Sequence, residues 1–148
     1  MIDIEIINDY KSSLKVNNSR IKTLFKKILN EEKINIAEVS LILSNRLYLN
    51  KLKKKYFQKD HYTDVIAFNL NNKNEDMIGE IYVSIDDIKS NSNFYNVEFD
   101  KEFGRVIIHG LLHIIGYEDN TKIRKEKMTK LENFYMLLIT ENLIKLQR

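Results

Sequence analysis

The sequence predicts an α+β fold in a single domain over residues 1–148, with about four strands in one mixed sheet packed by about five helices. Short β-branched runs alternate with longer segments whose apolar residues recur at helical spacing. One such segment, residues 105–115, is the most apolar helix of the chain, so we expect it to be central in the helical layer. The length is that of one ordinary domain, and no repeats or linkers interrupt it.

Four strands are predicted from runs of β-branched residues bounded by polar turn residues. The first two are Ile2–Ile7, which ends before an Asn-Asp pair, and Glu38–Ser44. The next two are Thr63–Phe68 and Ile78–Ile85. The Asn-rich segment Asn71–Asp76 reads as a turn between them, so we expect these two strands to pair as an antiparallel hairpin.

Helical periodicity predicts three helices before the central one. Ser19 is expected to cap the first, whose apolar face consists of Ile21, Leu24, Phe25, Ile28 and Leu29. The second spans Asn45–Phe57, with Leu47, Leu49, Leu52 and Tyr56 as its apolar positions, and a loop over Gln58–Tyr62 follows. Asp86 and Asp87 are expected to cap the third, which loosens across Asn91–Asn96.

The last two predicted helices flank a glycine turn. The first begins near Asp100 as its cap and ends at about Ile115, before a turn over Gly116–Asn120. Thr121 is a natural cap for a final helix that runs to about Lys145. The residues of this final segment expected to face the core are Met128, Leu131, Phe134, Tyr135, Leu138 and Leu143.

Two histidines in the central helix indicate a metal site. His109 and His113 are four residues apart, so both imidazoles lie on one helix face and can approach one ion. Gly116 can end the helix and turn the chain back, which carries Glu118 or Asp119 towards the same ion. Three protein ligands and one open position are the arrangement of a catalytic zinc.

A histidine pair at this spacing can also arise by chance or consist of two satisfied core histidines. The flanking residues favour a metal, because they are apolar and predict burial, and each nitrogen of a buried imidazole needs a partner. These flanking residues are Val106, Ile107, Ile108, Leu111, Leu112, Ile114 and Ile115.

The composition indicates the cellular compartment of the protein but does not identify its binding partner. The chain has no cysteine, which excludes disulfides and thiolate metal sites. It has no apolar run of about 18 residues, and its first residues are acidic and alternating, unlike a signal peptide. We therefore expect a cytoplasmic protein with no membrane partner. A net charge of +3 neither requires nor excludes a nucleic-acid partner.

The second helix carries the densest basic patch, formed by Lys51, Lys53, Lys54 and Lys55 beside Tyr56 and Phe57. Lysines beside aromatic rings suit a phosphate backbone and a stacked base, and a solvated helix face is the alternative. The third histidine, His61, lies in the following loop, where it is either solvent-exposed or approaches a substrate.

The segment HGLLHIIGY, residues 109–117, resembles the H-G-x-L-H-L-x-G-Y signature of the YbeY endoribonucleases, bacterial proteins implicated in ribosomal RNA maturation. Thr63–Phe68 is similar to that family's T-D-V-L-S-F segment, and Gly79–Ser84 to its G-D-I-x-I-S segment. Met128 and Glu132 fall where the family usually has Met and Glu. The resemblance runs from about residue 41 to residue 132 and agrees with the α+β prediction.

The resemblance implies a metal-dependent endoribonuclease with one zinc ion per chain. It implies single-stranded RNA as substrate, precursor ribosomal RNA in particular. It further implies action with the ribosome or ribosomal proteins and beside other RNA-processing nucleases.

Two positions depart from the family pattern. The third ligand, usually histidine, falls on Asp119, and its harder oxygen ligand could broaden metal choice towards manganese or iron. Glu118 competes with it by reach alone. Phe57 occupies the place of a family arginine, so any phosphate contact of that arginine must come from Lys55, Lys59 or elsewhere.

Metal-activated hydrolysis is the chemistry that these residues predict, with His109, His113 and Asp119 holding the ion. Glu118 is the candidate base, and Asp64 or Thr63 is expected to orient water or a metal-bound histidine. The residues expected to bind RNA phosphates are Lys55, Lys59 and Arg105.

Two other functions compete with metal-activated RNA hydrolysis. A zincin protease needs Glu after its first histidine, where this chain has Gly110, which leaves space for substrate or for close helix packing. The remaining alternative is a metal-stabilised ribosome-assembly or RNA-binding factor with little hydrolytic activity.

Overall fold

The computed structural model describes residues 1–57, 63–70 and 76–145. Within these ranges it has four strands: β1 (Ile2–Asn8), β2 (Ala37–Ser44), β3 (Val65–Asn69) and β4 (Met77–Ser84). The helices are α1 (Asn18–Glu31), α2 (Arg46–Phe57), α3 (Ile85–Tyr95), α4 (Phe99–Ile115) and α5 (Lys122–Met136). The predicted α+β fold, with four strands and five helices, is confirmed.

The strands form one mixed sheet in the order β1-β2-β4-β3. β1 pairs with β2, and β2 with β4, in parallel. β3 is antiparallel to β4, which confirms the predicted hairpin, with Val65 opposite Val83 and Asn69 opposite Gly79. The turn predicted between these strands falls mostly on residues 71–75, outside the described residues.

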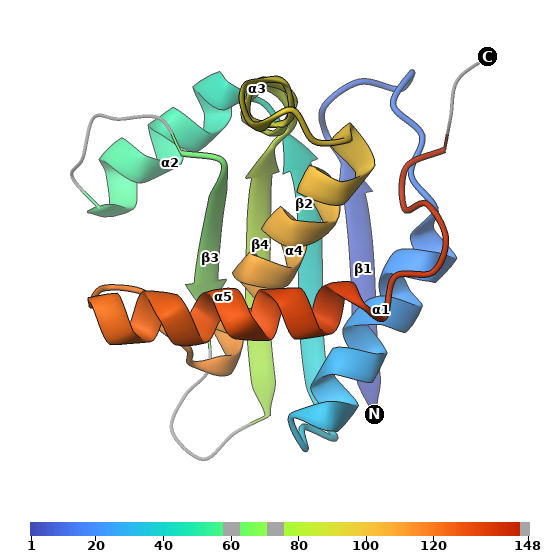
Figure 1. Cartoon of the computed structure of the whole chain (residues 1–148), viewed down its shortest axis with the longest axis vertical. Coiled ribbons are helices and arrows are strands. Elements are labelled where there is room, and N and C mark those ends of the chain that lie inside the picture. The colour runs from blue at the N-terminus through green and yellow to red at the C-terminus, as the bar shows by residue number, and fades with distance from the viewer. Residues whose placement is uncertain (58–62, 71–75, 146–148) are drawn as a thin grey trace.

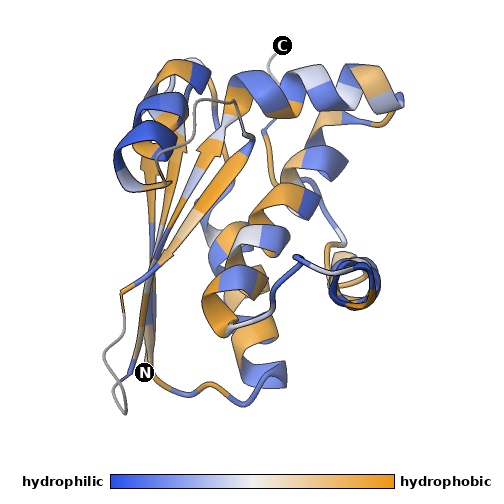
Figure 2. Ribbon diagram, turned by 90° about the vertical axis from the view of Figure 1, so that its left-hand side faces the viewer, coloured by the Kyte–Doolittle hydropathy of each residue, from blue (hydrophilic) through white to orange (hydrophobic). Residues whose placement is uncertain are grey.

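The helices form layers around this sheet. α4 runs diagonally across one face of the sheet, and α5 crosses α4 on the side away from the sheet (Figure 1). The side view shows α4 between the sheet and α5, so the predicted central position of the histidine helix is confirmed (Figure 2). α2 contacts the other face of the sheet, where Tyr48 packs on Tyr82 of β4.

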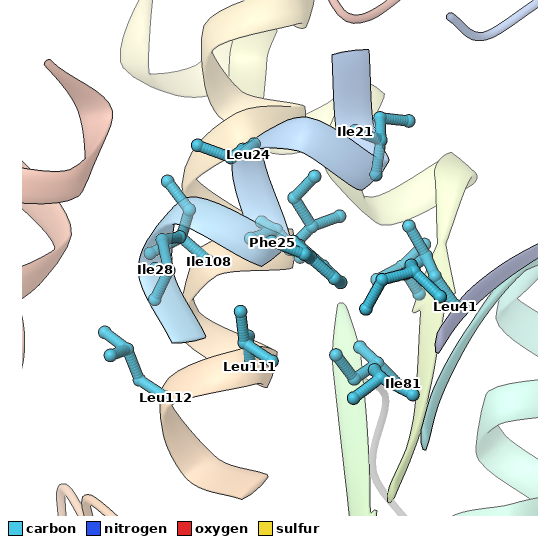
Figure 3. Packing of buried hydrophobic residues seen from close by; sticks show 14 of the residues in the cluster. Ile21, Leu24, Phe25, Ile28, Leu41, Ile81, Ile108, Leu111 and Leu112 are labelled. Atoms are coloured by element: carbon cyan, nitrogen blue, oxygen red, sulfur yellow. The ribbon is translucent and has the colours of Figure 1, made fainter. Parts of the chain in front are cut away.

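The main core lies between α1, α4 and the sheet (Figure 3). Side chains from α1, including Phe25 and Ile28, meet Ile108 and Leu111 of α4 above Ile81 of β4, and all five are fully buried. Burial of each such side chain stabilises the fold by about 1.5–3 kcal/mol. The helix that carries both histidines is therefore packed into the core.

Gly110 brings α4 unusually close to the sheet. A Cβ atom at this position would lie 2.6 Å from Cγ2 of Ile81 and 3.1 Å from Cγ2 of Val65. These distances are shorter than ordinary van der Waals contact, so only glycine fits without a shift of its neighbours. The space beside His109 is thus used for close helix–sheet packing, the second of the two uses expected for it.

Several predicted helix starts were wrong by one or two residues. α1 is capped by Asn17, whose Oδ1 accepts from the backbone N–H of Arg20 at 3.2 Å, and not by Ser19. α3 is capped by Ser84 and not by the two aspartates after it. The Asn-rich segment does not loosen, because α3 remains helical to Tyr95.

Asp100 does not cap α4, which begins one residue earlier at Phe99. Its Oδ1 instead accepts the backbone N–H groups of Leu143 and Ile144, both at 2.8 Å. This contact ties the C-terminal segment to α4. Consistently, α5 ends at Met136 and does not continue to residue 145 as predicted.

Some predicted apolar faces are only partly buried. In α2, Leu49 is buried, whereas Leu47 is 68% exposed and Tyr56 is 56% exposed. In α5, Met128 and Tyr135 are buried as predicted, but Phe134 is 52% exposed. α2 and α5 are surface layers, so hydrophobicity alone overestimated their contact with the core.

Candidate metal centre

The last two turns of α4 bring His109 and His113 together. Their ring centroids are 4.5 Å apart and the ring planes are nearly perpendicular, at 83°. The two Nε2 atoms lie 2.9 Å apart. This confirms the predicted placement of both imidazoles on one helix face with nitrogens directed at a common point.

A glycine turn returns Asp119 to this point. Gly116 ends α4 with a positive φ of 124°, and the backbone N–H groups of Gly116 and Tyr117 both bond to the carbonyl of Leu112, at 3.1 and 3.0 Å. Positive φ is readily adopted by glycine and rarely by other residues. The reversed chain places Asp119 Oδ2 3.3 Å from His109 Nε2 and 3.7 Å from His113 Nε2.

In the described part of the chain, His109, His113 and Asp119 form a group whose three ligand atoms lie within 4.8 Å of one another. Imidazole nitrogen and carboxylate oxygen are ordinary ligands of zinc and of related divalent ions. Of the two carboxylates that the turn could return, Asp119 is the one in this group. These residues could therefore hold a metal ion.

The outer nitrogen of each imidazole is held by another part of the protein. His109 Nδ1 lies 2.7 Å from Oε2 of Glu132 on α5, and His113 Nδ1 lies 3.0 Å from the carbonyl oxygen of Tyr117. A carbonyl only accepts, so the His113 Nδ1 carries hydrogen and its Nε2 presents a lone pair to the common point. Arg105 bonds to Oε1 of Glu132 at 3.2 Å and fixes that carboxylate in turn.

The pKa values of the two histidines shift in opposite directions. Burial by itself would lower the pKa of His109, but the Glu132 carboxylate, aided by Asp119 and Asp64, raises it above the ordinary value. Burial and the neighbouring His109 lower the pKa of His113. The 2.9 Å contact between the two Nε2 atoms accommodates one hydrogen between them. A bound cation would take the place of that proton.

The other predicted catalytic residues lie around the group and outside it. Glu118 is exposed, and its carboxylate bonds to Arg124 at 2.8 Å. Asp64 accepts from Asn91 Nδ2 at 3.1 Å, and burial raises its pKa although the nearby His109 charge opposes this. Thr63 Oγ1 donates to the Val65 carbonyl at 3.3 Å.

Two of the predicted RNA-binding residues, Lys55 and Arg105, lie in the described part of the chain. Lys55 is exposed, with its Nζ 5.2 Å from the centre of the Tyr56 ring. Arg105 bonds to Glu132 and also to Asn133 Oδ1 at 3.0 Å. Lys59 and His61 lie outside the described residues.

Phe57 belongs to an aromatic cluster at the end of α2. Its ring stacks on Phe68 of β3 with centroids 5.9 Å apart, and Lys53 lies over its ring at 4.9 Å. The phenylalanine thus joins the end of α2 to the sheet.

Sequence reasoning missed two contacts that support the group: those of Glu132 and of the Tyr117 carbonyl. Only for Glu132 did the sequence contain a feature that could have predicted the contact. It is acidic, yet it lies four residues after Met128 on the buried face of α5, where an isolated charge would be costly. A backbone carbonyl leaves no such signal in the sequence.

A mixed sheet and a buried His-x₃-His helix, closed by a glycine turn that returns a carboxylate, define an α+β protein with a candidate single-metal centre. The family model described as Endoribonuclease YbeY matches residues 6–139, and the chain belongs to this family. No described helix is long and apolar enough to cross a membrane.

Curated relatives support the same assignment. The chain is 36% identical over 110 residues to Endoribonuclease YbeY of Amoebophilus asiaticus, which covers 74% of this chain and 75% of the relative. It is 38% identical over 106 residues to Endoribonuclease YbeY of Christiangramia forsetii, with 72% and 73% covered. The solution structure of TM1509 from Thermotoga maritima matches with a TM-score of 0.58 and 29% identity, over 89% of this chain and 88% of that one.

Proposed function

We propose that this protein is a metal-dependent, single-strand-specific endoribonuclease that acts in ribosomal RNA maturation and ribosome quality control. Its relatives are named Endoribonuclease YbeY, and the family match covers most of the chain. The observation that carries the metal dependence is the meeting of two imidazole nitrogens and one carboxylate oxygen within 4.8 Å. The proposed setting is the cytoplasm, with the ribosome or ribosomal proteins and other RNA-processing nucleases as partners.

In this proposal His109, His113 and Asp119 hold one zinc ion. When bound, such an ion polarises a phosphoryl oxygen and lowers the pKa of water from 15.7 towards about 7. Glu132 and the Tyr117 carbonyl keep the two Nε2 lone pairs directed at the ion. An aspartate ligand also accommodates manganese or iron, so zinc is the first metal to test.

Asp64, Thr63 and Glu118 are proposed to act at the edge of this centre. Asp64 suits proton transfer, because its raised pKa brings it closer to neutral pH and it interacts with His109. Thr63 precedes it at the entry to β3 and is proposed to orient water. Glu118 must leave Arg124 before it can accept a proton.

Phosphate binding is assigned in the proposal to Lys55, Lys59 and Arg105. Lys55 is exposed and close to an aromatic ring, as expected for a residue on a single-stranded RNA path. Arg105 has a second role in this proposal, because its bond to Glu132 positions the carboxylate that orients His109.

One observation favours a second candidate function, a metal-stabilised ribosome-assembly or RNA-binding factor with little hydrolytic activity. Phe57 replaces a family arginine and stacks on Phe68, so it supplies no charge to a phosphate. A site with fewer cations stabilises the developing charge of phosphodiester cleavage less well.

Cleavage of a single-stranded RNA by the purified protein separates the two candidates. The endoribonuclease predicts cleavage that is lost with chelator and in His113→Ala, and restored to the wild type when zinc is added back. RNA binding without cleavage, surviving both treatments, would support the assembly factor. Elemental analysis of untreated protein identifies the metal, and Tyr10→Phe is the matched control outside the centre.

A further inference from the structure

Glu32 lies directly after α1, far from the histidines in sequence, yet it contacts the metal-site turn. Its Oε1 accepts the hydroxyl hydrogen of Tyr117 at 2.6 Å, and its Oε2 accepts that of Tyr135. Both oxygens of one carboxylate are thus bound by phenols from different segments. Charge-assisted hydrogen bonds of this kind are stronger than neutral ones.

Tyr117 is the residue whose backbone carbonyl holds His113. The phenol of Tyr117 is fixed by Glu32, and Lys127 lies over its ring with Nζ 5.3 Å from the centroid. Its carbonyl oxygen is 3.0 Å from His113 Nδ1. The side chain of Tyr117 therefore anchors the peptide unit that orients His113.

Both histidines are consequently held from α5. Glu132 reaches His109 directly, at 2.7 Å. Tyr135, three residues further along the same helix and 1% exposed, reaches His113 through Glu32 and Tyr117. The second route is longer and passes through the end of α1.

We infer that Glu32 is a positioning residue of the metal centre, which sets the orientation of His113 by anchoring the Tyr117 turn. This inference rests on the proposed metal site. Loss of Glu32 frees the phenol of Tyr117, so the turn can move its carbonyl away from His113 Nδ1. His113 then samples the tautomer with hydrogen on Nε2, whose Nε2 has no lone pair for the cation.

The test compares Glu32→Ala, Glu32→Gln and Tyr117→Phe with the wild type, by competition for zinc against a chromophoric chelator. Glu32→Ala should weaken zinc binding about tenfold, the low end of the range for outer partners of metal ligands. Glu32→Gln keeps one acceptor oxygen and the shape of the side chain, so it should recover part of the loss. Tyr117→Phe removes one hydroxyl and leaves the carbonyl, and should behave like Glu32→Ala.

A spectroscopic measurement on the metal-free protein separates positioning from general destabilisation. The chain has three histidines, so ¹⁵N labelling of the rings gives signals that variants at His109 and His113 assign. In Glu32→Ala the Nδ1 signal of His113, which reports the contact with the Tyr117 carbonyl, should change, whereas the Nδ1 signal of His109, held by Glu132, should not. A purely structural role for Glu32 would change both Nδ1 signals or neither.

Two matched variants control for charge and for stability. Glu31→Ala removes the same charge one residue earlier, at an exposed position. Tyr10→Phe removes another phenol–carboxylate hydrogen bond, the 2.9 Å contact with Asp86. Both should bind zinc like the wild type, even if Tyr10→Phe lowers the melting temperature as much as Tyr117→Phe does.

Unchanged zinc affinity in Tyr117→Phe and Glu32→Ala, while the wild type binds zinc, would overturn this inference and leave the proposed function intact. Equal changes in the Nδ1 signals of both histidines would overturn it as well. If the wild type binds no divalent metal, the proposed function fails, and the ring spectra still decide whether Glu32 positions His113. If Glu32→Ala does not fold, Tyr117→Phe tests the same Glu32–Tyr117 contact by its zinc affinity and ring spectra.

Discussion

Two polar networks join distant segments of this chain, and they differ in how many hydrogen-bond donors are available to their acceptors. In the first, the Asp86 network, Asp86 accepts from the Tyr10 phenol at 2.9 Å and from the backbone N–H of Arg46 at 3.0 Å. Asp87 accepts from Nε of Arg46 at 3.0 Å and from Oγ of Ser84 at 2.6 Å. Each acceptor named here has a donor from the protein itself.

The second, the histidine network, consists of His109, His113, Asp119 and Glu132. Its outer contacts use the Nδ1 hydrogens, so the inner point has two Nε2 atoms and one carboxylate oxygen with a single proton to share. Three acceptors that meet around one proton are poorly satisfied, and the partial burial of the two imidazoles adds to the cost. In these two networks, a shortage of hydrogen-bond donors, more than the presence of charge, distinguishes the candidate binding site from the structural crosslink.

The largest effect is expected for removal of an inner acceptor. Asp119→Ala should weaken zinc binding by about 100-fold or more, beyond the 10–100-fold typical of outer partners, because a ligand is lost. Asp119→His restores a nitrogen ligand and should keep the affinity within about tenfold of the wild type. Competition with a chelator measures the zinc affinity of the wild type, Asp119→Ala and Asp119→His. Equal affinities would show that Asp119 does not bind the ion and would move that role to Glu118 or water.

A smaller loss is expected for an outer contact of the histidine network. Glu132→Gln keeps the shape of the side chain but removes the charge that bonds to His109 Nδ1. Zinc affinity should fall about 10–100-fold, since outer partners orient a ligand and raise its basicity. Glu126→Gln on the exposed side of α5 is the matched control and should leave the zinc affinity unchanged. An unchanged zinc affinity in Glu132→Gln would mean that helix packing alone orients His109.

The comparison also shows what could be predicted from the sequence. The spacing of His109 and His113 specified their shared face, because helix geometry is local. Gly116 predicted the turn for the same reason. Most of the strands and helices followed from periodicity, and their errors lay at the ends, where Asn17 and Ser84 proved to be the caps.

The contacts that periodicity could not predict all join segments distant in sequence. Asp100 holds the C-terminal segment in place of capping α4, and Glu32 binds two tyrosines that lie 85 and 103 residues away. Side chains of these types are common at helix ends and on surfaces, so the residue type alone does not indicate which residue it contacts. Only the packing of α1 and α5 around α4 brings them together.

The Asp86 network should affect stability without affecting the metal. Asp86→Ala leaves the Tyr10 phenol and the Arg46 N–H without their acceptor, which should cost about 1–3 kcal/mol of unfolding free energy. Urea denaturation of the metal-free protein measures this cost. Zinc affinity should remain within about twofold of the wild type, since sites without shared partners act independently. A tenfold loss of zinc affinity would show that the two networks are coupled through α3.

The smallest and most diagnostic effect is the pH dependence of unfolding in the metal-free protein. Burial raises the pKa of Asp86, but its bonds to Arg46 and Tyr10 outweigh this and lower it below the ordinary value. Its contribution is present above the unfolded pKa, about 4, and is lost as pH falls through the folded pKa. The pKa of His109 is raised, so its contribution is present below about 6.5 and is lost as pH rises through the folded value.

The two networks should therefore weaken at opposite ends of the pH scale. The lowered pKa of His113 confines its own proton change to below about pH 6.5, so it does not mask the loss from His109. Urea unfolding with chelator, from pH 3 to 9, should show a loss of stability at low pH (the acid limb), which Asp86→Asn reduces, and a loss at high pH (the alkaline limb), which Glu132→Gln reduces. With zinc the alkaline limb should reverse, because the ion takes the place of the shared proton and binds more tightly as pH rises. An alkaline limb unchanged by zinc would mean that no metal occupies the space between the two imidazoles.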